Sequence, residues 1–251
     1  MAAEFEGPRT AIVTGGARRI GAELVRALAA DGWHVLIHFN RSESEARALA
    51  AEVGNASIVQ AELAESDSAE RIVAALAGLP PARLLVNNAS RFVLDSATDF
   101  SVEGWDLHLD ANLRAPALLS QAFAARLAEG EGLIVNLLDA KLASLNPDFF
   151  SYTISKIGLA GLTELTARAF APRIRVCGIA PSVTLVSGPQ SRDNFDEVHD
   201  LNALKRGVDV AEIVGALRFI IATPTLTGQT ITLDGGQRFL GLSRDVQFLE
   251  S

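Results

Sequence analysis

The sequence predicts a doubly wound α/β fold, with a parallel sheet of about seven strands in a single domain. Short runs rich in Val, Ile and Leu alternate with longer amphipathic runs along nearly all of the 251 residues. The short runs lack polar alternation, which is typical of parallel strands covered by helices on both faces. A glycine-rich segment also separates the first short run from the first long one. Together these observations predict a Rossmann-type sheet.

The expected elements follow from these runs in chain order. The strands are expected at Thr10–Thr14, His34–Phe39, Ser57–Gln60, Arg83–Val86, Gly132–Leu137, Ile174–Ile179 and Gln229–Leu233. The helices are expected at Ile20–Asp31, Glu43–Glu52, Asp67–Ala77, Trp105–Ala128, Ser151–Phe170 and Val210–Ala222. Open parallel sheets bind ligands beyond the carboxyl ends of their strands. The chemistry is therefore expected in the segments that directly follow the strands.

Composition narrows the classes of partner. The formal net charge is −8 and the pI is about 5.1, so the surface repels nucleic acid. No apolar stretch has the length of a membrane span, and residues 1–9 look like a short tail rather than a signal peptide. The single cysteine, Cys177, lies in an apolar run and is expected to be a buried, inert thiol. We expect a cytoplasmic protein without a metal site.

The segment TGGARRIG, residues 14–21, joins the first strand to the first helix. Glycines allow the backbone to approach a pyrophosphate closely, and the helix start offers free N–H groups and the positive end of its dipole. A dinucleotide site is favoured here over an ordinary turn. The residues expected to bind the cofactor are Gly15, Arg18, Arg19, Ile20 and Gly21.

The end of the second strand indicates which dinucleotide is bound. NAD sites usually place an acid there, whereas this chain has Asn40, Arg41 and Ser42. An arginine suits the extra phosphate of NADPH, although an arginine that merely lies in a loop is the alternative. After the third strand, Glu62 and Leu63 are expected at the adenine.

The reacting end is expected around Tyr152 and Lys156, which open a helix after the fifth strand. A spacing of four residues puts the two side chains on one helix face, and a neighbouring ammonium lowers the pKa of a phenol. Tyr152 is therefore a candidate general acid for a carbonyl or imine that receives hydride. By itself such a pair is common on helix surfaces, and only its place in the fold favours catalysis.

These motifs resemble the short-chain dehydrogenase/reductase family, in order, from Thr10 to about Gly236. The resemblance rests on residues 14–21, the Asn87-Asn88-Ala89 turn, Asn112, the Tyr152/Lys156 pair, Ala180-Pro181 and Asp234-Gly235-Gly236. It implies that Tyr152 is the catalytic acid and that Lys156 lowers its pKa and binds the nicotinamide ribose. It implies that Asn112 holds a water beside Lys156. Cofactor contacts are implied for Asn88, Ala89, Ser90, Pro181 and Ser182.

Two departures from the usual pattern narrow the substrate. Arg19 stands where the family usually has glycine, and Asp139 stands where it usually has serine, thirteen residues before the tyrosine. Ser144 is nearby, but its spacing is wrong. The departures resemble the pteridine reductase branch, whose bacterial members look like dihydromonapterin or dihydrofolate reductases. That resemblance implies pterin contacts from Arg19, Ser90, Phe92, Asp139 and Tyr152, with Phe92 stacked on the ring.

Each departure has an alternative interpretation. Phe92 as a core residue, Asp139 as a turn cap and Arg19 as a phosphate ligand only would all be ordinary. The favoured function is hydride transfer from NADPH to a C=N bond of a pterin, dihydropterin or dihydrofolate. A reductase of a ketone, sugar or acyl thioester is the first alternative. A non-catalytic NADP(H)-binding sensor or scaffold is the second.

Three segments are expected to act outside the central motifs. Residues 187–208 are expected to form a mobile substrate lid, with a short helix near Phe195–Leu204 and substrate contacts from Leu201, Leu204 and Lys205. The apolar tail, residues 238–251, is expected to pack on a partner subunit. The family resemblance implies a homotetramer whose dimer face contains the helices at Trp105–Ala128 and Ser151–Phe170.

Overall fold

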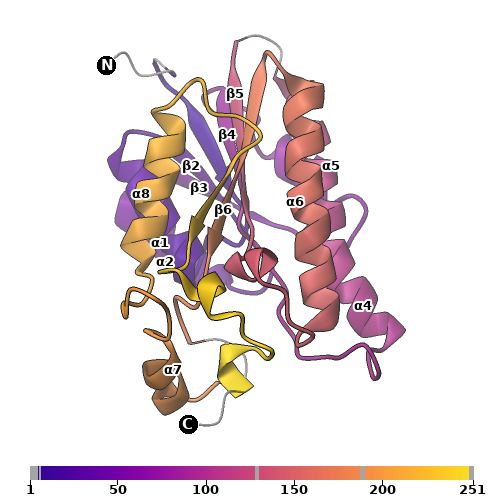
Figure 1. Ribbon diagram of the computed structural model, residues 1–251. Helices are drawn as coiled ribbons and strands as arrows, with labels where there is room; N and C mark the ends of the chain where they lie inside the picture. The colour runs from indigo at the N-terminus through magenta and orange to yellow at the C-terminus, as the bar shows by residue number, and fades with distance from the viewer. Residues whose placement is uncertain (1–4, 6, 128–129, 187–189, 249–251) are drawn as a thin grey trace.

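The computed structural model describes residues 5, 7–127, 130–186 and 190–248. Its centre is one sheet of seven strands, all parallel, in the order β3-β2-β1-β4-β5-β6-β7, which confirms the predicted fold class (Figure 1). The strands are β1 Thr10–Val13, β2 His34–Phe39, β3 Ala56–Gln60, β4 Ala82–Asn87, β5 Gly132–Leu137, β6 Ile174–Pro181 and β7 Thr230–Leu233. The order reverses between β1 and β4, and ligands bind at such a switch point.

Helices cover both faces of the sheet. On one face lie α1 Arg19–Ala30, α2 Glu43–Val53 and α8 Val210–Ile221; on the other lie α3 Ser68–Ala74, α4 Val102–Leu109, α5 Ala115–Arg126 and α6 Phe150–Phe170 (Figure 1). A short α7 spans Arg192–Val198. The sheet is therefore shielded from water except at its strand ends.

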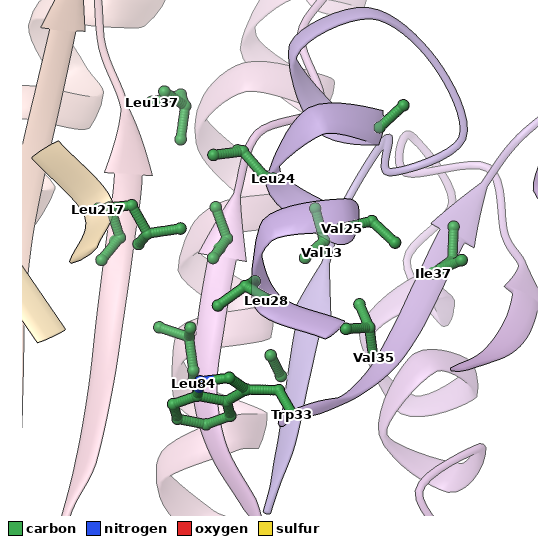
Figure 2. Close-up of a cluster of buried hydrophobic side chains, with 14 of the residues drawn as sticks. Val13, Leu24, Val25, Leu28, Trp33, Val35, Ile37, Leu84, Leu137 and Leu217 are labelled. Carbon is green, nitrogen blue, oxygen red and sulfur yellow. The ribbon is translucent and has the colours of Figure 1, made fainter. Parts of the chain in front are cut away.

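Apolar side chains fill the space between the sheet and each helical layer. On the α1 side, Leu24, Leu28 and Trp33 pack against strand residues such as Val35 and Leu84 (Figure 2). These side chains are at most 2% exposed. Burying a large apolar side chain contributes about 1.5–3 kcal/mol, so this packing fixes where α1 begins relative to the end of β1.

The helix expected at Trp105–Ala128 begins earlier and is not uniform. It starts at Val102, and a π-helical segment, Asp110–Arg114, separates α4 from α5; Ala128 lies outside the described residues. Such π-helical segments often lie at functional sites. This one carries Asn112, which is fully buried.

The contact of the tail with a partner subunit stays a prediction, whereas contacts of residues 241–248 within their own chain are present in the structure. This segment, which we call the C-terminal strap, folds back over the carboxyl end of the chain's own sheet and buries Val246. Phe239 and Leu240, just before the strap, stay exposed, and Leu249 lies outside the described residues. Within the described ranges, no helix combines the length and the apolar character needed to cross a membrane.

Candidate active site

A cavity of about 780 Å³ opens at the carboxyl ends of the strands. The residues that the sequence predicted for the site line this cavity, with the exceptions of Asn112 and of the lid residues Leu201, Leu204 and Lys205. Among the lining residues that were not predicted are Lys141 and Asn146, from the segment after Asp139, and Arg244, Asp245 and Gln247, from the C-terminal strap.

Close backbone packing shapes the glycine-rich turn. A Cβ added to Gly21 would meet the Gly15 carbonyl oxygen and would lie 2.7 Å from Asn88 Nδ2. Asn88 itself donates from Nδ2 to the carbonyls of Thr14 (2.8 Å) and Gly15 (3.2 Å). The turn after β4 therefore clamps the turn after β1, and only glycine fits position 21.

His38, which the sequence did not single out, supports the same turn. Its Nδ1 accepts the Gly15 N–H at 3.1 Å, which leaves Nε2 to donate to the Ala61 carbonyl at 3.0 Å. Burial lowers the pKa of His38 to about 4 and outweighs the Ala61 and Glu62 contacts, which raise it. The imidazole is thus a neutral bridge between the ends of β1 and β3, and its Nδ1 can accept a hydrogen bond only because it is uncharged.

The end of β2 presents one unpaired cation to the cavity. Arg41 is exposed, and its guanidinium has no partner among the described residues. Its neighbour Asn40 donates to the Glu62 carboxylate instead, and Glu62 also lies 3.4 Å from Arg91. The Arg18 guanidinium lies 3.7 Å from Glu45, and both side chains are largely exposed.

Arg19 occupies a backbone conformation that favours glycine. Its φ is +56°, in the left-handed region, which costs a residue with a Cβ about 1 kcal/mol. Its Nη1 donates to the Val186 carbonyl at 2.8 Å. The strained backbone therefore places a guanidinium between the glycine-rich turn and the segment after β6.

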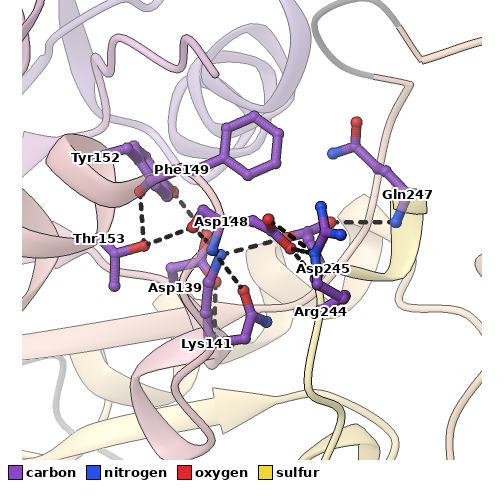
Figure 3. Close-up of polar contacts among 10 residues, drawn as sticks. Asp139, Lys141, Asp148, Phe149, Tyr152, Thr153, Arg244, Asp245 and Gln247 are labelled. Carbon is purple, nitrogen blue, oxygen red and sulfur yellow. Dashed lines mark hydrogen bonds and ion pairs between the residues drawn. The ribbon is translucent and has the colours of Figure 1, made fainter. Parts of the chain in front are cut away.

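Tyr152 and Asp139 form a direct hydrogen bond. The Tyr152 hydroxyl donates to Asp139 Oδ2 at 2.6 Å, while Asp139 Oδ1 accepts the Lys141 backbone N–H at 2.8 Å (Figure 3). Asp139 is therefore both a turn cap and a partner of the phenol. The turn-cap interpretation of Asp139 is confirmed, and its contact with a pterin stays a prediction.

The pKa of Tyr152 is raised in this arrangement, whereas the sequence predicted that Lys156 would lower it. Burial raises the pKa of Tyr152 well above its usual value of 10, and the charge of Asp139 and its hydrogen bond raise it further. Lys156 Nζ lies 5.6 Å from the centre of the Tyr152 ring and donates to the Leu137 carbonyl at 2.7 Å. Burial lowers the pKa of Lys156 to about 8, against the opposing effect of Asp139. Burial first, and the Asp139 carboxylate second, therefore favour the protonated phenol.

Asn112 joins the π-helical segment to two neighbours. Its Oδ1 accepts the Arg91 N–H at 2.7 Å, and its Nδ2 donates to the Arg91 carbonyl and to Ser155 Oγ, each at 3.0 Å. The side chain thus ties the turn after β4 to α6. It lies beside the cavity rather than in its wall.

Phe92 lines the cavity but already has one stacking partner. Its ring stacks on Phe149 with centroids 4.1 Å apart, and it meets Tyr152 edge-to-face at 4.7 Å. Phe92 and Tyr152 thus form an apolar wall of the cavity, and the buried Phe149 packs behind Phe92. Such a wall suits a flat aromatic or heterocyclic ligand.

The strap brings charged residues to the other side of this wall. Arg244 Nε donates to both carboxylate oxygens of Asp148, at 3.0 and 2.8 Å, and Asp245 lies 3.5 Å from Lys141 Nζ (Figure 3). No spacing rule connects residue 245 with residue 139, so motif reading missed this part of the site.

The segment expected to be the lid lies mostly outside the cavity wall. Residues 187–189 lie outside the described part, and the predicted contacts Leu201, Leu204 and Lys205 do not line the cavity. Instead, the Leu204 N–H donates to the Gly235 carbonyl at 2.9 Å, which anchors the segment to the turn after β7. Among the described residues there is no group of His, Cys, Asp and Glu that could hold a metal ion.

Comparison with known proteins identifies the family. Residues 9–196 match the family model described as short chain dehydrogenase. L-xylulose reductase from Mesocricetus auratus is 31% identical over 91% of this chain and 96% of that protein, and 3-oxoacyl-[acyl-carrier-protein] reductase from Synechocystis sp. is 29% identical over the same shares.

Two solved structures resemble the chain more strongly. FolM alternative dihydrofolate reductase 1 from Brucella canis, complexed with NADP, is 40% identical over 95% of this chain and 97% of that one, with a TM-score of 0.90. The Brucella suis protein, also in complex with NADP, has the same identity and coverage and a TM-score of 0.89. The chain belongs to the short-chain dehydrogenase family and is an oxidoreductase.

Proposed function

We propose that this enzyme uses NADPH to reduce a C=N bond of a pterin, a dihydropterin or dihydrofolate. The observation that carries the proposal is the 2.6 Å hydrogen bond from the Tyr152 hydroxyl to Asp139, at the position where the family resemblance leads one to expect a serine. A serine hydroxyl donates to a ketone oxygen, whereas a carboxylate accepts protons. The similarity to the NADP-bound Brucella reductases supports the same conclusion.

The cofactor would lie across the strand ends. The turn at residues 15–21 would face the pyrophosphate, and the unpaired Arg41, with Asn40 and Ser42, would bind the additional phosphate of NADPH. Glu62 and Leu63 would flank the adenine. The residues assigned to the nicotinamide half are Asn88, Ala89, Ser90, Lys156, Pro181 and Ser182, all of which line the cavity.

NADPH supplies the hydride, and the chain supplies the proton and the orientation. Tyr152 would give its hydroxyl proton to the ring nitrogen, and the resulting phenolate would take a new proton from water that enters the open cavity. Between turnovers, Asp139 Oδ2 would accept the hydrogen bond of the Tyr152 hydroxyl and orient it. Phe92 would stack on the flat ring, while Arg19 and Ser90 would bind its polar edge. The Asn112 side chain would keep the turn after β4 in place beneath the ring.

The test is a spectrophotometric assay of NADPH oxidation with dihydropterins and dihydrofolate. We expect turnover of at least one of these, and a large loss of kcat in the Asp139→Ser variant. If no pterin is reduced and methotrexate-like compounds do not bind, the proposal fails. If Asp139→Ser instead keeps or raises the reduction of a ketone, sugar or acyl thioester, a carbonyl reductase is the correct function.

We also propose a homotetramer located in the cytoplasm. Exposed apolar residues on the outer face of α6, Ile157 and Leu165, and Phe219 on α8 support an assembly that covers these helices. The single buried cysteine fits a reducing compartment. Light scattering that gave the mass of a monomer would refute the assembly, and fractionation of the source cells would test the location.

A further inference from the structure

The C-terminal strap is fixed directly against the residues that precede Tyr152. Besides the two Arg244 contacts, the Asp245 backbone N–H donates to Asp148 Oδ2 at 2.7 Å (Figure 3). Phe248 also stacks on Phe149, with centroids 5.9 Å apart. Asp148 and Phe149 lead into α6, whose first turn carries Tyr152. The strap therefore lies beside the phenol and moves only if these contacts break.

The strap brings the carboxylate of Asp245 into the cavity with weak partners. The side chain is only 16% exposed, its Oδ2 is 3.5 Å from Lys141 Nζ, and its Oδ1 accepts the Gln247 N–H at 3.2 Å. Burial raises the pKa of Asp245 and the charge of Asp139 raises it further, while Lys141 and the Gln247 N–H oppose them. Because the Asp245 carboxylate is buried and only loosely paired, water screens its charge weakly, and the charge acts on neighbouring groups.

The formal charges of the groups around Tyr152 cancel when Asp245 is included. The loop at residues 139–148 contributes Asp139, Lys141 and Asp148, α6 contributes Lys156, and the strap contributes Arg244 and Asp245; the ring of His108, on α4, lies 6.4 Å from the Tyr152 ring. Arg244 and Asp148 neutralise each other. Two lysines then face two carboxylates, and removal of Asp245 would leave an excess of positive charge beside the phenol.

We propose that Asp245 is a positioning residue of the proton donor: the strap places its charge so that the Tyr152–Asp139 pair keeps its proton until substrate takes it. A nearby negative charge disfavours the phenolate, and that of Asp245 contributes to the raised pKa of Tyr152, after burial and Asp139. This inference requires Tyr152 to be the acid but does not depend on which substrate is reduced.

The experiment uses the fact that Tyr152 is the only tyrosine in the chain. Protein grown with ¹³Cζ-labelled tyrosine gives one phenol resonance by NMR, which reports ionisation of Tyr152 without any assay of turnover. We expect the midpoint of this titration in Asp245→Asn to lie about one pH unit below that of the wild type, the order expected for loss of a partly screened charge. Asp245→Glu, which keeps the charge, should titrate like the wild type.

The matched control is Asp196→Asn, which removes a carboxylate from α7, where it pairs with Arg192 on the exposed surface. This variant should leave the Tyr152 midpoint unchanged. If the Tyr152 midpoints of Asp245→Asn and the wild type are equal, the proposal is overturned. It is also overturned if Tyr152 does not ionise in either protein before the protein unfolds at alkaline pH. A shift shared by the Asn and Glu variants also overturns it, because distortion of the strap rather than charge would be the cause. If the enzyme does not reduce pterins, the proposed function fails, but the NMR titration of Tyr152 still tests the role of Asp245.

Discussion

The two ends of the cavity are built in different ways. At the phosphate end, the short turns after β1 and β4 meet through hydrogen bonds from the Asn88 side chain to the backbone carbonyls of Thr14 and Gly15. At the reacting end, side chains far apart in the sequence form the site: Asp139 and Asp245 belong to a network that extends over more than a hundred residues.

Packing geometry determines the phosphate end of the cavity, whereas electrostatics determines the properties of the reacting end. Packing at the phosphate end leaves no room for a Cβ on Gly21, so the shape of that end is fixed by which atoms fit. At the reacting end, burial and nearby charges raise the pKa of Tyr152 and lower that of Lys156 to about 8. Substitutions at the first end should therefore change binding, and those at the second should change turnover.

The largest effect is expected at the reacting end. Tyr152→Phe removes the hydroxyl that donates to Asp139 and keeps the ring that packs on Phe92. We expect kcat to fall about 10²–10⁴-fold, the usual contribution of a general acid, with little change in the Kd for NADPH. Steady-state kinetics and fluorescence titration with NADPH measure the two quantities. A variant that retains most of its kcat would show that Tyr152 is not the proton donor.

At the phosphate end, Gly21→Ala should act on binding instead. The added methyl would collide with the Gly15 carbonyl and with Asn88, and overpacking of this kind costs about 1–3 kcal/mol. We expect the Kd for NADPH to rise by about one to two orders of magnitude. The matched control is Gly215→Ala on α8, where a Cβ meets nothing within 4 Å; it should stabilise the fold by about 0.5–1 kcal/mol. Equal effects at both positions would contradict the close-packing argument.

A third effect, on stability, concerns the neutral bridge made by His38. The unfolded chain takes up a proton on this histidine near pH 6.5, whereas the folded chain does so only near pH 4. The contribution of neutral His38 to the free energy of unfolding is therefore fully present above pH 6.5. As the pH falls from 7.5 to 5, the free energy of unfolding decreases by about 2 kcal/mol because the unfolded chain takes up the proton first. Urea unfolding at both values measures the loss. In His38→Asn this component should vanish, and the same loss in both proteins would assign it to other groups.

Sequence reasoning predicted the fold and most of the cavity wall because both depend on local patterns. The strand ends, the turn at residues 14–21 and the positions of Tyr152 and Asp139 follow from runs, spacings and a family resemblance. The sign of the Tyr152 pKa shift could not be found this way, because it depends on burial and on the distance to Asp139. The strap was interpreted as a subunit contact since its apolar residues indicate burial but not where they pack.

The smallest effect is expected from substitution of Arg41, the residue that we propose favours binding of NADPH over NADH. The guanidinium has no partner among the described residues, so replacing it by glutamine leaves no protein charge unpaired. Loss of one charge-assisted contact of about 1.5 kcal/mol should weaken NADPH binding roughly tenfold and leave NADH binding nearly unchanged. Titration of both cofactors against the wild type and Arg41→Gln gives the ratio directly. Equal loss for NADPH and NADH would place Arg41 on the part of the cofactor that both share, and the choice of NADPH would then have to come from Asn40 and Ser42.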